Sequence, residues 1–349
     1  SKMSNQFTGK IDIANFLERA KVIPVIDVRS PLEFETGHIP GSVNIPLFDD
    51  NSRKEVGIRY KKAGRLKAVI KGLELIGSEL PGKLETAIKE AVDKKLLVYC
   101  WRGGMRSETM AWLFSLGGID TGVLEGGYKS YRNYILGKLS AGRKMILLGG
   151  FTGSGKTLIL NQIKKKGEQI VDLEALANHK GSAFGALGQP SQPTSEHFCN
   201  LLFNELDQQD PLKPVWLEDE SRNIGTVFMP DNFFLNMQMN PSIVLLMDVK
   251  IRIPRLLEEY SVYPPEELEE GIMKISKRLG GDRTTEAIRA VRNKDFVRAI
   301  EITLDYYDKA YLYSLEKKPC NNIRYITTDI DNVEANSLKV IETARKIVW

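Results

Sequence analysis

The sequence of 349 residues contains only three cysteines and three histidines. Cys100, Cys199 and Cys320 are too few and too widely spaced for a disulfide framework or a zinc site. No apolar run approaches the roughly 18 residues that a membrane span requires. The polar stretch Ser1–Lys10 also lacks the apolar core of a signal peptide. We therefore predict a cytoplasmic protein without a membrane segment, in a compartment where thiols stay reduced.

A large excess of charge is also absent, since the net charge is only +4. This mild basicity permits a nucleic-acid partner but does not by itself indicate one. Hydrophobic residues make up 42% of the chain and charged residues 27%, as in globular proteins. The length favours two domains, each able to bury a core of its own.

A glycine-rich loop follows the strand-like apolar run Leu96–Tyr99. The loop begins at Cys100, and a helix-like run follows at Glu108–Leu116. A strand, a tight loop and a helix N-terminus direct backbone N–H groups toward one point, which holds anions and stabilises a thiolate. We predict that Cys100 is a nucleophile or a chalcogen carrier and that Arg106 grips the anion, with a buried structural cysteine as the alternative. The other predicted anion-binding residues are Trp101, Arg102, Gly103, Gly104, Met105 and Ser107.

The segments Val25–Arg29 and Gly37–Ser42, taken with Cys100–Ser107, resemble a rhodanese domain. This resemblance implies transfer of sulfur or selenium through a persulfide or perselenide on the cysteine. Small rhodaneses usually have four residues between the cysteine and the arginine, whereas Trp101–Met105 are five. The longer loop suits a larger or tetrahedral group, and the spacing also resembles that of cysteine-dependent phosphatases.

A basic segment interrupts this first half of the chain. Asn51–Lys71 contains eight lysines or arginines, and Glu55 is its only acidic residue. We predict a helical insertion near the Cys100 loop. It either contacts RNA phosphates or forms a solvated helix face.

The alternation of strand and helix restarts at Lys144–Leu148. The residues Gly150–Thr157 read GFTGSGKT, and a helix-like run follows at Leu158–Lys166. A G-x-x-x-x-G-K-T motif between a strand and a helix is a P-loop, whose glycines let the backbone wrap a diphosphate. Lys156 is predicted to reach the outer phosphate, and Thr157 suits Mg²⁺. The remaining predicted diphosphate-binding residues are Gly150, Thr152, Gly153, Ser154 and Gly155.

Further candidates follow two later strands. The strand Gln169–Leu173 leads into a loop of small and polar residues, and the strand Pro214–Leu217 ends in three carboxylates, as a Walker B strand does. No Asn-Lys-x-Asp motif for guanine follows, because Asn293–Asp295 has its acid one position early. The P-loop ligand could therefore be a diphosphate other than a nucleotide. We predict no dedicated set of metal ligands. The second-domain candidates are Asp172, Glu174, His179, Lys180, Ser182, Glu218, Asp219, Glu220, Ser221 and Arg222.

The segment Lys250–Leu315 is mostly helical by periodicity. It carries six basic residues over Arg278–Arg298 and four tyrosines after them. Such a mixture suits RNA phosphates and unstacked bases, and a helical lid of the P-loop domain is the alternative. We predict an α/β fold. A rhodanese-like parallel-sheet domain spans 1–135, and a P-loop NTPase-like α/β domain spans 136–349 with a helical part at about 250–315.

A rhodanese-like part followed by a P-loop part is similar to the tRNA 2-selenouridine synthase family. The resemblance rests on Cys100–Ser107, Gly150–Thr157, Asp172–Glu174 with His179–Ser182, and Glu218–Arg222. Lys180 stands where the family is expected to have arginine, which weakens a bidentate phosphate grip but keeps the charge.

This family resemblance implies conversion of wobble 2-thiouridine in tRNA into 2-selenouridine through an S-geranyl intermediate. Geranyl diphosphate and selenophosphate would be the co-substrates, with Mg²⁺ as a further ligand. The implied partners are tRNA and an enzyme that produces selenophosphate.

Two other functions fit the residues. The Cys-x5-Arg spacing is compatible with a cysteine-dependent phosphatase fused to a kinase-like P-loop domain. A non-catalytic RNA-binding NTPase with a vestigial rhodanese domain is the second alternative, although the intact Cys100 and Arg106 argue against it.

Overall fold

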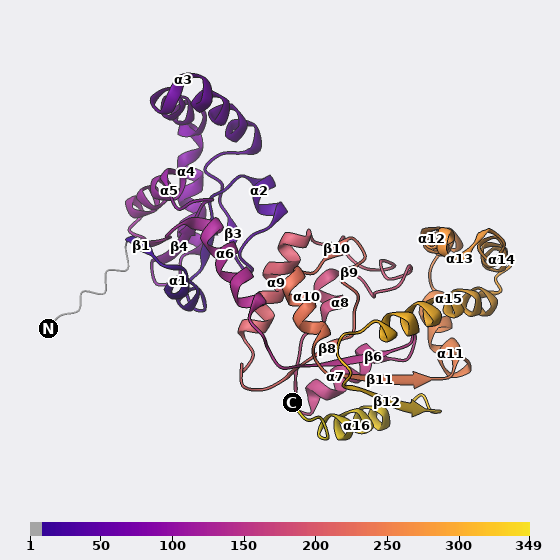
Figure 1. The fold of residues 1–349 in the computed structure, drawn as a ribbon. Helices are drawn as coiled ribbons and strands as arrows, with labels where there is room; N and C mark the ends of the chain where they lie inside the picture. Colours follow the sequence, from indigo (N-terminus) through magenta and orange to yellow (C-terminus); the bar gives the residue numbers. More distant parts are fainter. Residues whose placement is uncertain (1–8) are drawn as a thin grey trace. The chain divides into compact units, whose positions relative to one another are not determined.

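The computed structural model describes residues 9–349 and divides the chain into two compact units, Ser1–Lys138 and Leu139–Trp349 (Figure 1). The predicted polar segment Ser1–Lys10 lies largely outside the described residues. Among the helices that are described, none is both long and apolar enough to cross a membrane.

The first unit contains a parallel sheet with the strand order β1-β5-β4-β2-β3. Strand β4 lies between β2 and β5, with Val98 opposite both Ile26 and Val123. A strand in the middle of a parallel sheet is covered on both faces, which explains its continuous apolar run. The strands are β1 (Gly9–Ile11), β2 (Val25–Asp27), β3 (Val43–Asn44), β4 (Lys95–Tyr99) and β5 (Asp120–Leu124).

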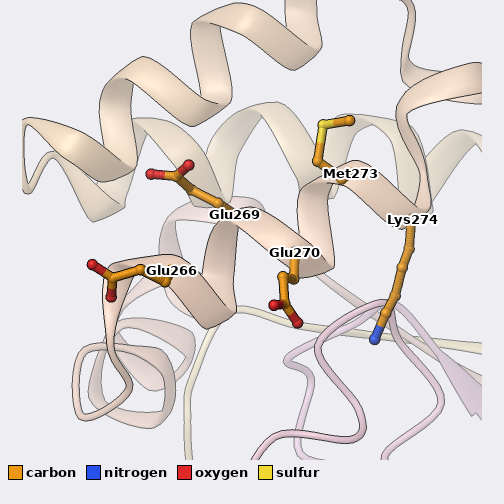
Figure 2. A pocket seen from close by; sticks show the side chains of 5 residues that line it. All are labelled: Glu266, Glu269, Glu270, Met273 and Lys274. Carbon is orange, nitrogen blue, oxygen red and sulfur yellow. The ribbon is translucent and has the colours of Figure 1, made fainter.

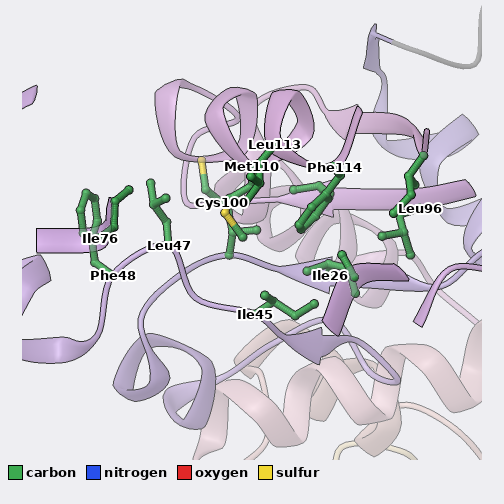
Figure 3. Close-up of a cluster of buried hydrophobic side chains, with 14 residues drawn as sticks. Ile26, Ile45, Leu47, Phe48, Ile76, Leu96, Cys100, Met110, Leu113 and Phe114 are labelled. Atoms are coloured by element: carbon green, nitrogen blue, oxygen red, sulfur yellow. The ribbon is translucent and has the colours of Figure 1, made fainter. Parts of the chain in front are cut away.

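Three helices of this unit, α3, α4 and α5, whose bounds are given below, share one hydrophobic core with the sheet (Figure 3). Leu96 of the sheet belongs to this core together with Met110 and Phe114, and Cys100 is a member of the same cluster. The helices are α1 (Ile13–Ala20), α2 (Pro31–Thr36), α3 (Asp50–Ile76), the 3₁₀ helix η1 (Gly77–Glu79), α4 (Leu80–Glu90), α5 (Met105–Leu116) and α6 (Gly127–Ser140).

Helix α3 is the predicted basic insertion, and it is longer than predicted. Its fully buried residues are Ala68, Gly72 and Ile76, all in its C-terminal third. Gly64 interrupts the helix with φ 82° and ψ 179°, a conformation that glycine adopts without a Cβ penalty. The N-terminal part of α3 therefore projects basic side chains without an apolar face of its own.

The second unit contains another parallel sheet, with the strand order β12-β11-β6-β8-β7. Strand β6 is central, and its Leu148 lies opposite Glu218 of β8 and Ile243 of β11. Ligands of open α/β sheets bind beyond the carboxyl ends of such strands. The strands are β6 (Met145–Gly150), β7 (Gln169–Ile170), β8 (Val215–Glu218), β11 (Ser242–Met247) and β12 (Ile323–Thr328).

The helices of the second unit fall into two groups. Those beside the sheet are α7 (Lys156–Lys165), α8 (Leu173–Ala177), α9 (Ser195–Asp207), α10 (Asp231–Gln238) and α16 (Val333–Ala344). Those of the helical part are α11 (Val249–Tyr260), α12 (Pro265–Lys274), α13 (Ser276–Leu279), α14 (Gly281–Arg292) and α15 (Phe296–Glu316). The helical part has its own core, which includes Leu256, Ile272 and Ile300. The strands β9 (Asn223–Ile224) and β10 (Val227–Phe228) form a small antiparallel pair. The predicted α/β class with a helical C-terminal part is confirmed.

Candidate active sites

The Cys100 loop starts at the carboxyl end of the central strand of the first unit. Cys100 directly follows β4, and α5 begins at Met105 with Gly104 as its N-cap. The Tyr128 N–H donates to the Cys100 carbonyl at 2.8 Å, and the Lys129 N–H donates to the Trp101 carbonyl at 3.0 Å. These bonds tie two carbonyl oxygens, which would repel an anion, to the start of α6.

Two glycines allow the loop to press against the turn after β5. Gly103 and Gly127 have φ values of 67° and 62°, and a Cβ on either would collide with the backbone of the facing segment. The larger side chains of the loop point outward, since Trp101 and Met105 are exposed. Trp101 packs on the ring of Tyr128 at a centroid distance of 5.9 Å. The loop is therefore held by backbone contacts, as a cradle for an anion would be.

The Cys100 sulfur lies within hydrogen-bonding reach of a buried hydroxyl. Ser107 Oγ is 3.1 Å from Cys100 Sγ and 3.0 Å from the Gly104 carbonyl. The single hydroxyl proton can move from the carbonyl to the sulfur when the sulfur carries a negative charge. Such a donor stabilises a thiolate both as a nucleophile and as a leaving group.

Arg106 is held beside the loop by a residue that no sequence motif indicated. Its guanidinium makes two hydrogen bonds to Glu33 of α2, at 2.7 and 3.3 Å. Burial alone would raise the pKa of Glu33, but the hydrogen bond and charge of Arg106 outweigh it and lower that pKa. Arg53 of α3 is also 3.9 Å from the same carboxylate. Glu33 therefore links the predicted anion-binding arginine to the base of the basic helix.

The P-loop connects β6 to α7 as predicted. Gly153 and Gly155 have φ values of 82° and 78°, so both take conformations that favour glycine. Ser154 Oγ donates to the Phe151 carbonyl at 2.7 Å, and Lys156 Nζ donates to the Gly150 carbonyl at 3.1 Å. The loop is thus a closed backbone turn with its lysine folded along it.

A cluster of three carboxylates lies next to the P-loop. Oxygens of Glu174, Glu218 and Glu220 lie within 4.8 Å of one another. Thr157 Oγ1 donates to Glu218 at 2.6 Å and is 3.4 Å from Glu174. Burial, together with the charges of Glu218 and Glu220, raises the pKa of Glu174 to about 10. Burial and the charge of Glu218 raise the pKa of Glu220 to about 7, and burial also raises the pKa of Glu218.

The other residues of the Glu218–Arg222 run point elsewhere. Asp219 accepts a hydrogen bond from Lys318 Nζ at 2.6 Å and a longer one from Tyr311 at 3.4 Å. Ser221 is exposed and bonds the Asn223 carbonyl, and Arg222 pairs with Asp231. Only Glu218 and Glu220 of this run, among the described residues, join the carboxylate cluster.

The loop after α8 closes over the carboxylates. Gly181 lies so near that a Cβ there would be 2.7 Å from Glu174 Oε1. The Gly181 N–H donates to His179 Nδ1 at 3.1 Å, and burial followed by the charge of Lys274 lowers the pKa of His179. The remaining predicted residues have local roles: Lys180 pairs with Glu259, Ser182 Oγ accepts from the Phe184 N–H, and Asp172 caps α8.

Two family models match the chain. One, described as a tRNA 2-selenouridine synthase AAA domain, matches residues 143–336, and a rhodanese-like domain matches residues 12–134. The tRNA 2-selenouridine synthase of Nitrosomonas europaea is 32% identical, over 85% of this chain and 90% of the relative. That of Shewanella frigidimarina is 36% identical, over 84% of this chain and 89% of the relative.

The chain belongs to the tRNA 2-selenouridine synthase family. The predicted family is therefore confirmed, and with it the prediction that the chain is an enzyme.

One open surface pocket of this tRNA 2-selenouridine synthase family member is lined by none of the predicted site residues. It has a volume of about 570 Å³, and Figure 2 shows the side chains of α12 that line it. Three of the five lining residues are the carboxylates Glu266, Glu269 and Glu270. Their charge opposes a diphosphate or selenophosphate, so we do not assign the active site to this pocket.

The crowded carboxylates should make the second unit sensitive to pH. Because the pKa of Glu174 is raised from 4.5 to about 10, the native state keeps a proton that the unfolded state loses. Without divalent cations, stability should therefore fall as pH rises through that interval. Glu174→Gln should raise the melting temperature at pH 9 by several degrees and should make stability depend less on pH. In a unit of this size, a change of about 1 kcal/mol in the free energy of unfolding shifts the melting temperature by roughly 2–4 °C.

This prediction is checked by thermal unfolding with EDTA or with Mg²⁺. Mg²⁺ should restore the wild type at pH 9 and have little effect on Glu174→Gln. Glu266→Gln, at an exposed position on α12, is the matched control. A wild-type stability that rises between pH 6 and pH 9 in EDTA would contradict it.

Proposed function

We propose that the enzyme converts wobble 2-thiouridine of tRNA into 2-selenouridine through an S-geranyl intermediate, with geranyl diphosphate and selenophosphate as co-substrates. The observation that carries this proposal is the presence of two different anion sites in one chain. One has a thiol hydrogen-bonded by a hydroxyl at the Cys100 loop. The other is a P-loop beside three carboxylates.

The P-loop suits the first reaction. The sulfur of 2-thiouridine attacks C1 of the geranyl group, the C1–O bond breaks, and its electron pair leaves with diphosphate. A proton is lost from N3 of the base. Negative charge grows on the leaving diphosphate, where the P-loop N–H groups and Lys156 can stabilise it.

The carboxylate cluster fits a hard divalent cation. Thr157, Glu174 and Glu218 offer the oxygen ligands that Mg²⁺ prefers. Burial raises the pKa of both glutamates, and the charge of Glu218 adds to the shift of Glu174. A bound cation would favour the ionised form of both. When bound, Mg²⁺ would neutralise charge on the leaving diphosphate. Glu220 completes the cluster, and burial and the charge of Glu218 raise its pKa to about 7.

Electron counting limits what Cys100 can do in the second reaction. Selenium in selenophosphate is already at the oxidation level of selenide, so a cysteine perselenide would need an additional oxidant. Attack of the Cys100 thiolate on phosphorus needs none. An S–P bond forms, the P–Se bond breaks, and hydroselenide leaves with the electron pair.

The hydroselenide then attacks C2 of the S-geranyl uridine, and geranyl thiolate leaves and takes a proton. Water hydrolyses the phosphocysteine and returns the thiolate. The Ser107 hydroxyl can stabilise the negative charge on the sulfur before it attacks phosphorus and again when it leaves phosphorus. Arg106 can bind the phosphoryl oxygens. The five residues between Cys100 and Arg106, which suit a tetrahedral group, agree with this route.

Mass spectrometry of nucleosides tests the function directly. The tRNA is incubated with the protein, geranyl diphosphate and selenophosphate, and then digested. We expect S-geranyl-2-thiouridine without selenophosphate and 2-selenouridine with it. Unchanged nucleoside masses despite tight tRNA binding would instead favour a non-catalytic RNA-binding protein, and phosphate release from an aryl phosphate would favour a phosphatase.

Helix α3 is the surface that we expect to bind tRNA phosphates. Six exposed basic residues of α3 form no ion pair with any described residue: Lys54, Arg59, Lys61, Lys62, Arg65 and Lys67. In the C-terminal basic run, three of the six basic residues, Arg283, Arg292 and Arg298, are each paired with an acidic neighbour. Although both runs are candidates from sequence, the unpaired charges favour α3.

Changing Lys61, Lys62 and Arg65 to glutamate should weaken tRNA binding and flatten its salt dependence. The slope of log K against log salt should fall by roughly one unit for each phosphate that the protein no longer neutralises. Binding is measured at several salt concentrations. Reversal of Arg283, Arg292 and Arg298 is the comparison and should change the slope less. An unchanged slope in the α3 variant would contradict the assignment to α3.

A further inference from the structure

We propose that Arg255 of α11 binds the diphosphate at the P-loop together with Lys156. The inference rests on the proposed function, since it adds a residue to the diphosphate site assigned there. The group that Arg255 would bind is a phosphate oxygen of the ligand. Geranyl diphosphate and a nucleotide both carry such an oxygen.

Helix α11 is fixed against the P-loop by two neighbouring residues. Arg252 Nη1 donates to the Thr152 carbonyl at 3.1 Å, and its guanidinium also pairs with Asp308 at 2.6 Å. Leu256 packs on Gly153 so closely that a Cβ there would lie 2.8 Å from the leucine side chain. The position of Arg255, between these two contacts, is therefore set by the fold.

The Arg255 guanidinium lies directly over the start of α7. A Cβ on Gly155, the N-cap of α7, would collide with Arg255 Nη1. The N–H groups that follow this N-cap are those with which a P-loop binds phosphate. Arg255 thus faces the place where a bound diphosphate meets the helix N-terminus.

One side of this guanidinium lacks an acceptor. Nη2 is ion-paired with Asp331, whereas Nη1 is buried and has no hydrogen-bond partner within residues 9–349. A buried N–H without an acceptor is costly, and charged groups are the costliest. A phosphate oxygen bound at the P-loop would supply that acceptor, while Nη2 keeps its pair with Asp331.

The test is calorimetric titration of the full chain with Mg-pyrophosphate and, separately, with MgATP. Arg255→Ala should weaken pyrophosphate binding by about 10- to 100-fold, the range expected for one charged hydrogen bond. Arg255→Lys should lose less, because it keeps the charge. Asp331→Asn, which removes the partner but leaves the guanidinium, should stay within about threefold of wild type by the same reasoning. Arg283→Ala, which loses a surface ion pair on α14, should bind normally.

Thermal unfolding without ligand shows whether each variant folds. If Arg255→Ala and Asp331→Asn lose the same affinity for pyrophosphate, Arg255 only connects two elements of the fold and the inference is overturned. Normal binding of pyrophosphate and ATP by Arg255→Ala would also overturn it. If the wild type binds ATP but not pyrophosphate, and Arg255→Ala weakens ATP binding, then Arg255 is confirmed and the geranyl diphosphate assignment fails. Binding of neither ligand by the wild type would overturn both.

Discussion

Replacing Lys156 with alanine should slow geranyl transfer by a factor of about 10² or more, as removal of other preorganised charge-stabilising groups does. The effect should fall mainly on the rate, because charge on the diphosphate grows as the C1–O bond breaks. The measurement is S-geranyl-2-thiouridine formed per unit time. Lys164→Ala, at the exposed C-terminal end of the same helix, should leave the rate unchanged.

The same variant separates the two reactions. On tRNA that already carries the S-geranyl group, Lys156→Ala should insert selenium at a normal rate, since that chemistry belongs to the Cys100 loop. ATP should be unnecessary for geranyl transfer and should compete with geranyl diphosphate if it binds. Strict dependence on ATP hydrolysis would contradict the diphosphate assignment and indicate an ordinary NTPase.

Cys100→Ser should abolish 2-selenouridine formation while geranyl transfer continues, so S-geranyl-2-thiouridine should accumulate. The reason is that a serine hydroxyl is far less nucleophilic than a thiolate at neutral pH. Cys320→Ser is the matched control, because Cys320 is partly buried outside the loop. Undiminished selenium insertion by Cys100→Ser would remove the thiol from the mechanism.

Labelled selenophosphate tests which atom the thiolate attacks. Phosphorus label should become bound to the wild type and not to Cys100→Ser. Ser107→Ala should prolong the labelled state, because the sulfur then lacks its hydroxyl donor when it leaves phosphorus. Selenium bound to Cys100 without phosphorus would restore the perselenide that the rhodanese resemblance implies.

Much of the fold could be predicted from local sequence patterns. Buried parallel strands such as Leu96–Tyr99 are continuous apolar runs, and they alternate with helical segments. Strand β1 could not be predicted, because it has three residues, of which only Ile11 is buried. The two-residue strands β9 and β10 were missed for the same reason: they are too short for a period of two to show.

The candidate sites divide in a similar way. The Cys100 loop and the P-loop are contiguous motifs, so their residues could be named from sequence. Glu33 could not, because its partner Arg106 is 73 residues away in the sequence. Arg255 and Lys318 were missed for the same reason. Asp219 was grouped with its neighbours, although side chains at a strand end alternate, which sends Glu218 and Glu220 one way and Asp219 the other.

The strand order of the first sheet has a consequence for synthesis of the chain on the ribosome. Strand β1 pairs only with β5, so residues 9–11 emerge about 110 residues before their partners at 122–124. At typical translation speeds this wait lasts on the order of 5–20 s. During this interval β1 has no partner strand, and once β4 has emerged one of its edges stays unpaired. Unpaired strand edges are where strand-to-strand aggregation begins. When β5 emerges it pairs with both β1 and β4, before the P-loop has emerged.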